Sequence, residues 1–328
     1  MTERAFHPMR VGGVGLCSAH EGDTLTALRK ITDGVARRKR HPTFVGADGM
    51  KQLCAPVPGC ETERDTVARV SYLAANARTS LHGAVREPQL SVLLLPALLG
   101  PGSPLHEATQ QAVSNGMFGV VPDEVIFGGT SAAADKICDI SVRLHKGDIT
   151  DCLFVCADTR ISPFVLDIME VTGRAPVRAV PHAPLPGELG VALYLCPVHG
   201  DGIVKGQTVT HFATAQEPYA PDDKNRSLMG RASVPAFLGL GSIPDKARLL
   251  VDADGQRHKA EEVGVILSAG ISVAEEDVAA PSASIGTVGC ATLPLFLGTG
   301  LALLFDEAPA VVGWVCGDAN ERFVLHMQ

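Results

Sequence analysis

Two hydroxyl side chains, Thr130 and Ser131, lie at the start of a predicted helix, directly after a glycine turn. Residues 125–127 form a short β-rich run, and a turn of two glycines follows. Apolar side chains then recur with the three/four spacing of a helix over residues 130–146. Such a turn presents the first helical residue at the positive end of the helix dipole, where enzymes often place a nucleophile. A hydroxyl group there predicts hydrolysis or acyl transfer, provided that a base lies within reach.

That base would have to be a histidine from elsewhere in the chain. His182 lies in a proline-rich loop and His211 on a predicted strand, and the sequence places neither beside Thr130. A threonine at this point can instead satisfy the free N–H groups of the first helical turn. We favour this capping role for Thr130 and for Thr287, which precedes a second apolar helix.

The nine cysteines predict neither a disulfide framework nor a metal site. Most fall in apolar segments, where a free cysteine packs as a small hydrophobic residue. Cys54 and Cys60 share a loop but have no His or Cys partner at metal-binding spacing. Cys152 and Cys156 occupy alternate strand positions that suit packing. We therefore expect no metal and no cofactor.

Composition and charge argue against several classes of protein. The 328 residues are 46% hydrophobic and 20% charged, as in ordinary globular proteins with a large core. A net charge of −8 argues against a nucleic-acid binder. The N-terminus has no apolar signal segment, and the most apolar run, residues 290–305, is short for a membrane span. We expect that run to be a helix buried on all sides and interrupted by Pro294, and the protein to be cytoplasmic.

Strands and helices alternate along the chain, which predicts an α/β layer structure. Residues 51–61 and 220–240 read as loops, and residues 244–251 as a short helix. Strands are predicted at residues 9–16, 90–99, 125–127, 152–156, 190–197, 203–215, 263–269, 311–316 and 323–326, and helices at 24–40, 62–80, 104–115, 130–146, 163–170 and 289–304.

Four cations lie at the end of the first predicted helix, residues 24–40. They are Arg37, Arg38, Lys39 and Arg40. Cations at a helix C-terminus complement the dipole, and we favour this interpretation. The alternative is a docking patch for an acidic partner.

The chain shows signs of an internal duplication. A Gly-Thr pair precedes a buried helix at residues 129–130 and again at residues 286–287, nearly half the chain apart. Both pairs have the same strand–turn–helix context. We therefore expect two similar halves, residues 1–198 with the helix at 130–146, and residues 199–328 with the equivalent helix at 289–304.

In the order and spacing of several segments, the sequence resembles the elongating β-ketoacyl synthases of the thiolase superfamily. The opening strand, glycine turn and first helix are similar to those of that family, as is the helix ending at Gly147-Asp148. The remaining segments that carry the resemblance are GELG (187–190), SASIGTVG (282–289) and Asn320 followed by FVL (323–325).

The resemblance implies a five-layered α-β-α-β-α fold of two similar halves that usually dimerises across a strand of the first half. It also implies decarboxylative condensation of an acyl chain with a malonyl unit on acyl carrier protein. That chemistry needs a cysteine thiolate at the helix N-terminus and two histidines, or a histidine and an asparagine.

Each catalytic position of the family carries a different residue here. Counting back from Gly147 places Thr130 at the nucleophile position. The first histidine belongs in the turn after a strand, which we assign to residues 263–269, so that Ala269 occupies its place. The second follows Ile-Gly, where Thr287 stands, and the family's lysine falls near Ser282. A threonine hydroxyl without a base is a poor substitute for a thiolate.

The altered positions resemble those of chain-length factors, the degenerate partners of ketosynthases in type II polyketide systems. The resemblance implies a heterodimer with an active synthase, a tunnel for the growing chain and an acyl carrier protein as a further partner. We expect Met117, Phe118 and Ser131 to contact the chain, with Met117 and Phe118 as tunnel plugs. Two alternatives stay open, namely an acyltransferase or thioesterase using Thr130 or Ser131, and a homodimeric acyl-binding protein.

Overall fold

The structure is a computed structural model of the chain. It describes residues 4–328 except for several short gaps. The gaps cover residues 83–86, 175–182, 199–206, 221–222, 224–229, 242, 245, 270–272 and 275–276.

Ten strands form one hydrogen-bonded sheet in the order β10-β9-β11-β12-β8-β1-β7-β6-β4-β5. The strands of the first half are β1 (Met9–Cys17), β4 (Leu90–Pro96), β5 (Glu124–Gly128), β6 (Cys152–Thr159) and β7 (Glu188–Pro197). Those of the second half are β8 (Gln207–Gln216), β9 (Arg248–Val251), β10 (Val278–Ala279), β11 (Val311–Cys316) and β12 (Glu321–Met327). A short pairing of β1 with β8 joins the two sets.

The two sets of strands have the same topology. Counted along the chain within each half, the third strand lies at the edge of the sheet, and the second, fourth, fifth and first strands follow toward the middle. The order is β5-β4-β6-β7-β1 in the first half and β10-β9-β11-β12-β8 in the second. The pairing sense also repeats, since β4 is parallel to β5 and β6, and β9 is parallel to β10 and β11. The fold is therefore built from two similar halves, and a division at residue 198 remains our proposal.

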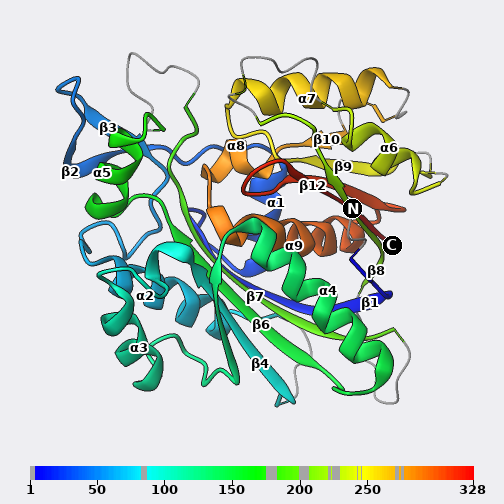
Figure 1. Ribbon diagram of the computed structural model, residues 1–328, viewed down its shortest axis with the longest axis horizontal. Coiled ribbons are helices and arrows are strands. Elements are labelled where there is room, and N and C mark those ends of the chain that lie inside the picture. Colours follow the sequence, from blue (N-terminus) through cyan, green and yellow to red (C-terminus); the bar gives the residue numbers. More distant parts are fainter. Residues whose placement is uncertain are drawn as a thin grey trace.

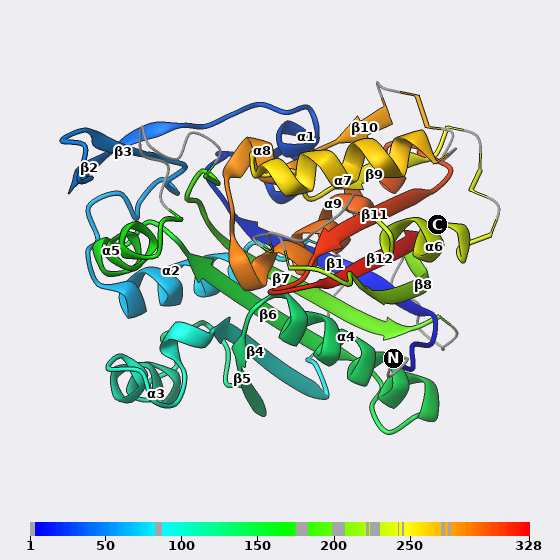
Figure 2. The same ribbon diagram turned by 45° about the horizontal axis from the view of Figure 1, so that its top comes forward.

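The helices occupy three layers around the two halves of the sheet (Figures 1 and 2). The central layer holds α4 (Thr130–Lys146) and α9 (Thr292–Phe305). One outer layer holds α2 (Thr66–Thr79) and α3 (His106–Ser114), and the other holds α6 (Ser233–Leu238) and α7 (Arg257–Ser268). The smaller helices are α1 (Thr24–Thr32), α5 (Pro163–Val171), α8 (Pro281–Ile285) and the 3₁₀ turns η1 (Ala97–Leu99) and η3 (Gly289–Ala291).

The alternation of side chains along each strand produces these layers. Val92 and Leu94 of β4 face the central core with α4 and α9, whereas Leu93 and Leu95 face the outer core with α2. A third core lies between α7 and the outer face of the second half, around Trp314. The expected five-layered α-β-α-β-α fold is confirmed.

The helix α9 is buried along its length up to Leu304, as its continuous apolar sequence predicts. Pro294 does not interrupt it, because it lies in the first turn, where backbone N–H groups have no partner inside the helix. In the part of the chain that the structure describes, no helix has the length and apolarity needed to cross a membrane.

The helix α4 begins and ends where the sequence predicts. Its apolar stripe, which includes Ile137, Ile140 and Leu144, is buried. Gly147 ends it with φ of 76°, the left-handed conformation that glycine adopts without strain.

The prediction for residues 24–40 is wrong in its second part. The helix α1 ends at Thr32, and Gly34 follows with φ of 70°. Residues from Lys39 onward form β2 (Lys39–Val45), which pairs with β3 (Lys51–Cys54) in a separate two-stranded sheet. The cations Arg37 to Arg40 therefore lie beyond the helix and do not complement its dipole.

Three predictions in the second half are also wrong. The loop expected over residues 220–240 contains the helix α6. Residues 263–269 belong to the helix α7 and its C-cap, and residues 248–251, expected as a helix, form β9. The apolar run that suggested a strand lies on an amphipathic helix, in which Glu262 and Ile266 face the core and Leu267 faces solvent. Short apolar runs fit either element, and the partners in the fold decide between them.

One buried histidine makes the stability of the fold sensitive to pH. His41 Nδ1 accepts hydrogen bonds from the backbone of Thr43 and Phe44, and Nε2 lies 3.1 Å from the Ile161 carbonyl, which fixes a neutral ring. Burial lowers the pKa of His41 from its ordinary value of 6.5. The unfolded chain then takes up a proton below pH 6.5 while the folded chain does not, so His41 lowers the free energy of unfolding as pH falls.

We expect His41→Gln, which cannot take up this proton, to lose less stability than the wild type between pH 7 and pH 5. Urea unfolding followed by fluorescence of Trp314, the only tryptophan, measures this. Burial raises the pKa of Asp158 and Glu262, which has the opposite effect on stability, so the difference between variant and wild type isolates His41. His82→Gln, at an exposed histidine, is the control, and an equal pH dependence in all three proteins would contradict the assignment.

Candidate functional site

The N-terminus of α4, where the family places its nucleophile, is occupied by a carboxylate of the chain itself. The backbone N–H of Thr130 donates to Asp318 Oδ1 and that of Ser131 to Oδ2, each at 3.0 Å. Asp318 comes from the turn between β11 and β12, in the other half. Gly129 is required here, because a Cβ would collide with this carboxylate. The helix dipole thus acts on Asp318, and the place of an incoming oxyanion is filled.

Both hydroxyl groups at the helix start are committed to hydrogen bonds. Thr130 is buried, and its Oγ1 donates to the carbonyl of Gly289 at 3.1 Å. Ser131 Oγ donates to Glu321 and accepts the backbone N–H of Asp318 at 3.2 Å. Thr130 therefore does not act as the side-chain cap that the sequence suggests, since Asp318 has that role.

A buried ion pair adjoins the carbonyl that Thr130 contacts. Arg160 Nη2 lies 3.3 Å from Asp158 Oδ2, which also accepts the backbone N–H of Cys290 at 3.0 Å. Burial raises the pKa of Asp158, while Arg160 opposes the shift. Asp158 raises the pKa of Arg160, with smaller contributions from Cys290 and Asp318. Arg160 and the Cys290 N–H thus hold one oxygen of the Asp158 carboxylate, Oδ2.

Thr287, the counterpart of Thr130 in the second half, is held by its backbone. Its N–H donates to Leu185 at 2.7 Å, and its carbonyl accepts the N–H of Gly187 at 3.1 Å. The preceding Gly286 has φ of 80° and packs so closely on Leu185 that a side chain would collide. Thr287 stands at a junction between the halves and is neither a base nor the cap of α9, whose first residue is Thr292.

The assignment of Ala269 to the first histidine position is wrong. Ala269 is the exposed C-cap of α7, whereas the family position follows a strand. The strand in this region is β9, and the turn after it carries Asp252 and Asp254. Lys259 Nζ of α7 donates to both carboxylates at 2.8 Å. An ion pair thus occupies the turn that follows β9.

This second charge cluster reaches the family's lysine position. Ser282 Oγ donates to Asp252 Oδ1 at 3.0 Å. Burial lowers the pKa of Lys259, but Asp252 and Asp254 outweigh it and raise the pKa overall. Lys259 is therefore held as a cation and cannot act as a base.

The thiols near α4 are buried and unsuited to nucleophilic attack. Burial raises the pKa of Cys138 to about 12, so that thiolate is scarce at neutral pH. Cys290 Sγ lies 3.5 Å from Cys156 Sγ, and burial raises the pKa of Cys290 well above its ordinary value. No three His, Cys, Asp or Glu side chains among the described residues come together in a way that would hold a metal ion.

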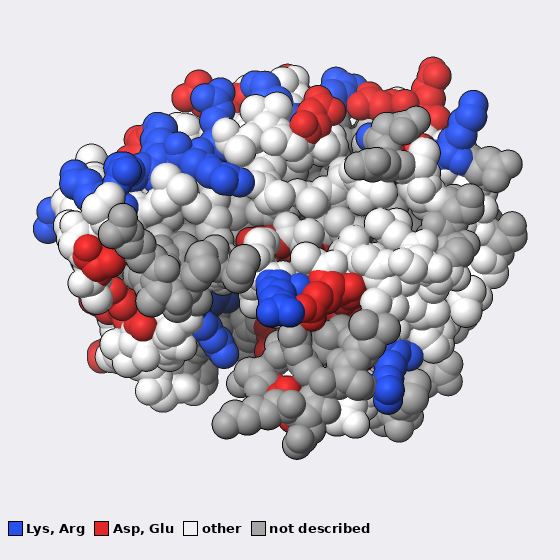
Figure 3. Space-filling view, turned by 90° about the horizontal axis from the view of Figure 1, so that it is seen from above, with Lys and Arg blue, Asp and Glu red and all other residues white. Residues whose placement is uncertain are grey.

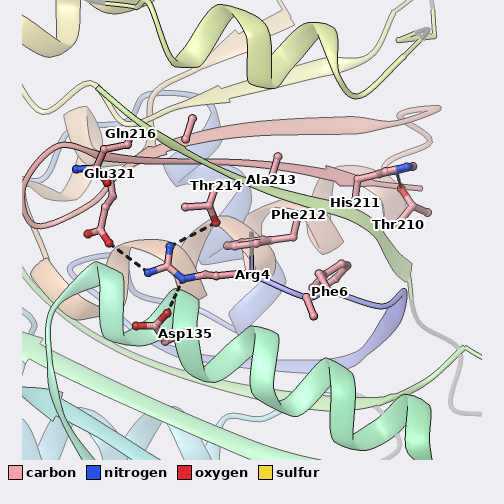
Figure 4. Close-up of a pocket in the computed structure, with 12 residues that line it drawn as sticks. Arg4, Phe6, Asp135, Thr210, His211, Phe212, Ala213, Thr214, Gln216 and Glu321 are labelled. Atoms are coloured by element: carbon pink, nitrogen blue, oxygen red, sulfur yellow. Dashed lines mark hydrogen bonds and ion pairs between the residues drawn. The ribbon is translucent and has the colours of Figure 1, made fainter. Parts of the chain in front are cut away.

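A groove of about 1090 Å³ lies between α4 and β8, beneath the N-terminal segment (Figure 4). Arg4 crosses it, contacting Asp135 and Glu321 and donating to Thr214 Oγ1 at 3.4 Å. His211 lies at the other end of the groove from Glu321 in Figure 4 and is not brought to Ser131. His182, the other candidate base, falls outside the described residues.

The two predicted tunnel residues have different surroundings. Phe118 is fully buried among α2 and the outer face of β4 and β6, on the side of the sheet away from α4. This placement favours a packing role for Phe118. Met117 is 49% exposed, and its contact with an acyl chain stays a prediction.

Sequence reasoning missed Asp318, Asp254, Lys259 and the Asp158–Arg160 pair. The sequence around Asp318 gives little indication of its role, because acidic residues are common in hairpin turns. Asp252 and Asp254 directly follow the apolar residues 249–251, a pattern typical of acids at the end of a strand. The incorrect prediction of a helix over residues 244–251 prevented this interpretation.

Comparison of the sequence with protein-family models and with curated proteins gives no match. Solved structures do match in fold over nearly the whole chain. The ishigamide ketosynthase/chain length factor matches with a TM-score of 0.69 at 15% identity, covering 98% of this chain and 99% of that one. A type II polyketide ketosynthase, solved with its acyl-carrier protein and a hexaketide, gives 0.71 at 12%, covering 98% and 99%.

OleA of Xanthomonas campestris, bound to cerulenin, matches with a TM-score of 0.62 at 12% identity, covering 98% of this chain and 99% of that chain. Identities this low show the fold alone. The chain therefore has the thiolase-type fold of ketosynthases, as its sequence predicts.

We expect Asp318→Ala to lower the free energy of unfolding by about 1–2 kcal/mol, because two backbone N–H groups of α4 lose their partner. Urea denaturation measures this. Asp318→Asn, which keeps one acceptor oxygen, should lose less. Asp167→Ala, at an exposed acid of α5, is the control, and a loss in Asp318→Ala no larger than in this control would show that the cap contributes nothing.

Proposed function

We propose that this chain is a non-catalytic, ketosynthase-like subunit, similar to a chain-length factor. It pairs with an active β-ketoacyl synthase and shapes the tunnel for the acyl or polyketide chain. An acyl carrier protein is the further partner, and the cytoplasm is the expected location. The observation that carries the proposal is the carboxylate of Asp318 at the start of α4.

The chemistry of the site supports a role without catalysis. Condensation needs a nucleophile, an empty oxyanion site and groups that stabilise an enolate. Here the hydroxyl of Thr130 donates to a carbonyl, and the carboxylate of Asp318 fills the oxyanion site. Lys259 pairs with Asp252 and Asp254 in the turn after β9. A developing oxyanion beside Asp318 would be destabilised by like-charge repulsion.

The edge of the first half supports pairing with a second subunit. β5 is the last strand of the sheet, and one of its sides has no strand partner among the described residues. Met117 is 49% and Val121 84% exposed in the segment that leads into β5. An edge strand with apolar neighbours is a ready surface for another chain. Glu124 is already paired with Lys136 and Arg143, which limits the cost of burying it.

The alternatives receive less support. An acyltransferase or thioesterase would need a base for Thr130 or Ser131. The Thr130 hydroxyl contacts only the Gly289 carbonyl in the described structure, whereas the Ser131 hydroxyl contacts the Glu321 carboxylate and the backbone N–H of Asp318. Because Glu321 is the carboxylate that contacts the Ser131 hydroxyl, an enzyme of this kind would have to use Ser131 as its nucleophile. A homodimeric acyl-binding protein would use the same β5 edge.

We expect no acylation of the purified chain by a β-lactone probe or an acyl thioester. Thr130→Cys should also label slowly with cerulenin, because Asp318 disfavours the thiolate, and Thr130→Cys combined with Asp318→Gly should label faster. Mass spectrometry of intact protein measures this. Labelling of Ser131 in the wild-type chain would favour the acyltransferase alternative and overturn the proposal.

We expect the chain to co-purify with an active ketosynthase from the same gene neighbourhood when the two are co-expressed. Met117→Glu with Val121→Glu should abolish this pairing by placing charges at the apolar margin of β5. Leu238→Glu, at a residue of α6 that is 64% exposed, is the matched control and should retain it. A symmetric homodimer that ignores the synthase would instead favour the acyl-binding alternative.

A further inference from the structure

The β2–β3 hairpin forms a small sheet separate from the central one. Among the described residues, its two strands pair only with each other, and it projects from the body of the fold beside α5 (Figure 1). Two-stranded sheets have little stability of their own, so contacts with other elements must support this one. His41 contacts the carbonyl of Ile161, and the backbone N–H of Ala47 donates to Glu170 of α5.

One face of the hairpin mixes apolar and cationic side chains. Arg40 stands opposite Leu53, and Val45 stands opposite Lys51. Leu53 is 41% and Val45 51% exposed, as is Met50 (51%) in the adjoining turn. Side chains paired across two strands lie on the same face, so apolar groups here alternate with positive charges.

The positive charge of this region is largely uncompensated. Lys39 pairs with Glu61, whereas Lys51 and Arg38 contact only carbonyl oxygens in the described structure. Figure 3 shows Lys and Arg gathered on the left of this face, the side on which Figure 1 places β2 and β3. These cations lie on a chain whose net charge is −8.

The neighbouring helix α5 extends the apolar surface. Phe164, Ile168 and Val171 follow the i, i+4, i+7 spacing, and each is exposed. Asp167 is exposed beside them. A face of this composition fits a partner helix with an apolar stripe flanked by carboxylates.

We propose that the exposed face of the β2–β3 hairpin, together with the apolar stripe of α5, is the docking surface for an acidic helix of an acyl carrier protein. This rests on the proposed function, for which it names the contact. An anionic membrane is the other acidic partner to consider, and the test below includes it as an outcome. A second copy of the same face fits less well, because its cations would repel each other.

The test measures binding of a fluorescently labelled holo acyl carrier protein of a type II polyketide system by anisotropy. The protein is the co-purified pair of this chain with its synthase. We expect Arg40→Glu with Lys51→Glu to weaken binding about tenfold or more, and the wild-type affinity to fall when salt is raised. Arg257→Glu, at an arginine of α7 that is 75% exposed, is the matched control and should bind as the wild type does.

A second pair of variants tests the apolar part. Leu53→Ser should weaken carrier binding, and Leu267→Ser, at a leucine of α7 that is 38% exposed, should not. Binding that is absent, or equal in all variants, overturns the proposal. If the pair does not bind the carrier but binds vesicles of phosphatidylglycerol, and the same residues are required for vesicle binding, the proposal is overturned in favour of a membrane.

The experiments distinguish failure of the docking surface from failure of the proposed function. Pairing with the synthase is measured independently, and the hairpin variants should leave it intact because β5 lies at the far edge of the sheet. A pair that forms but does not need the hairpin for carrier binding overturns only the docking surface. A chain that does not pair at all overturns the proposed function.

Discussion

The start of α4 is the constraint around which the two halves of the molecule are assembled. A helix that begins inside a protein leaves its first N–H groups without partners, and burying them unpaired is costly. Here Asp318 of the second half supplies the acceptors, and Gly129 makes the room. The same contact that stabilises the central helix also closes the site at which an enzyme of this fold would bind an oxyanion.

Charged side chains are paired at two further places in the fold. Asp158 pairs with Arg160 beside η3, and Lys259 pairs with Asp252 and Asp254 beyond β9. Removing one member of such a pair would leave an uncompensated buried charge, which is strongly unfavourable. Ion pairs between these side chains therefore help to stabilise this part of the fold.

The surfaces left for function lie away from that interior. The free edge at β5 has the apolar margin expected of a subunit contact, while the β2–β3 hairpin has the mixed apolar and cationic face expected of a contact with an acidic helix. The two regions are at different parts of the first half, so the two proposed contacts do not overlap. A non-catalytic subunit would act through such surfaces.

The sequence by itself determined the elements whose patterns are local and strong. The period of α4, its glycine end and the uniformly apolar α9 specify helices whatever surrounds them. The two similar halves were also expected, although the shared context of the Gly-Thr pairs is wrong, because the helix α8 and not a strand precedes Gly286. Only the tertiary structure decided the rest. Residues 263–269 suit a strand or a helix, and packing of Ile266 against the second-half core selected the helix. Asp318 and α4 are far apart in the chain, so no local pattern could join them, and the occupant of the site became apparent only once β11 and β12 were folded against the other half.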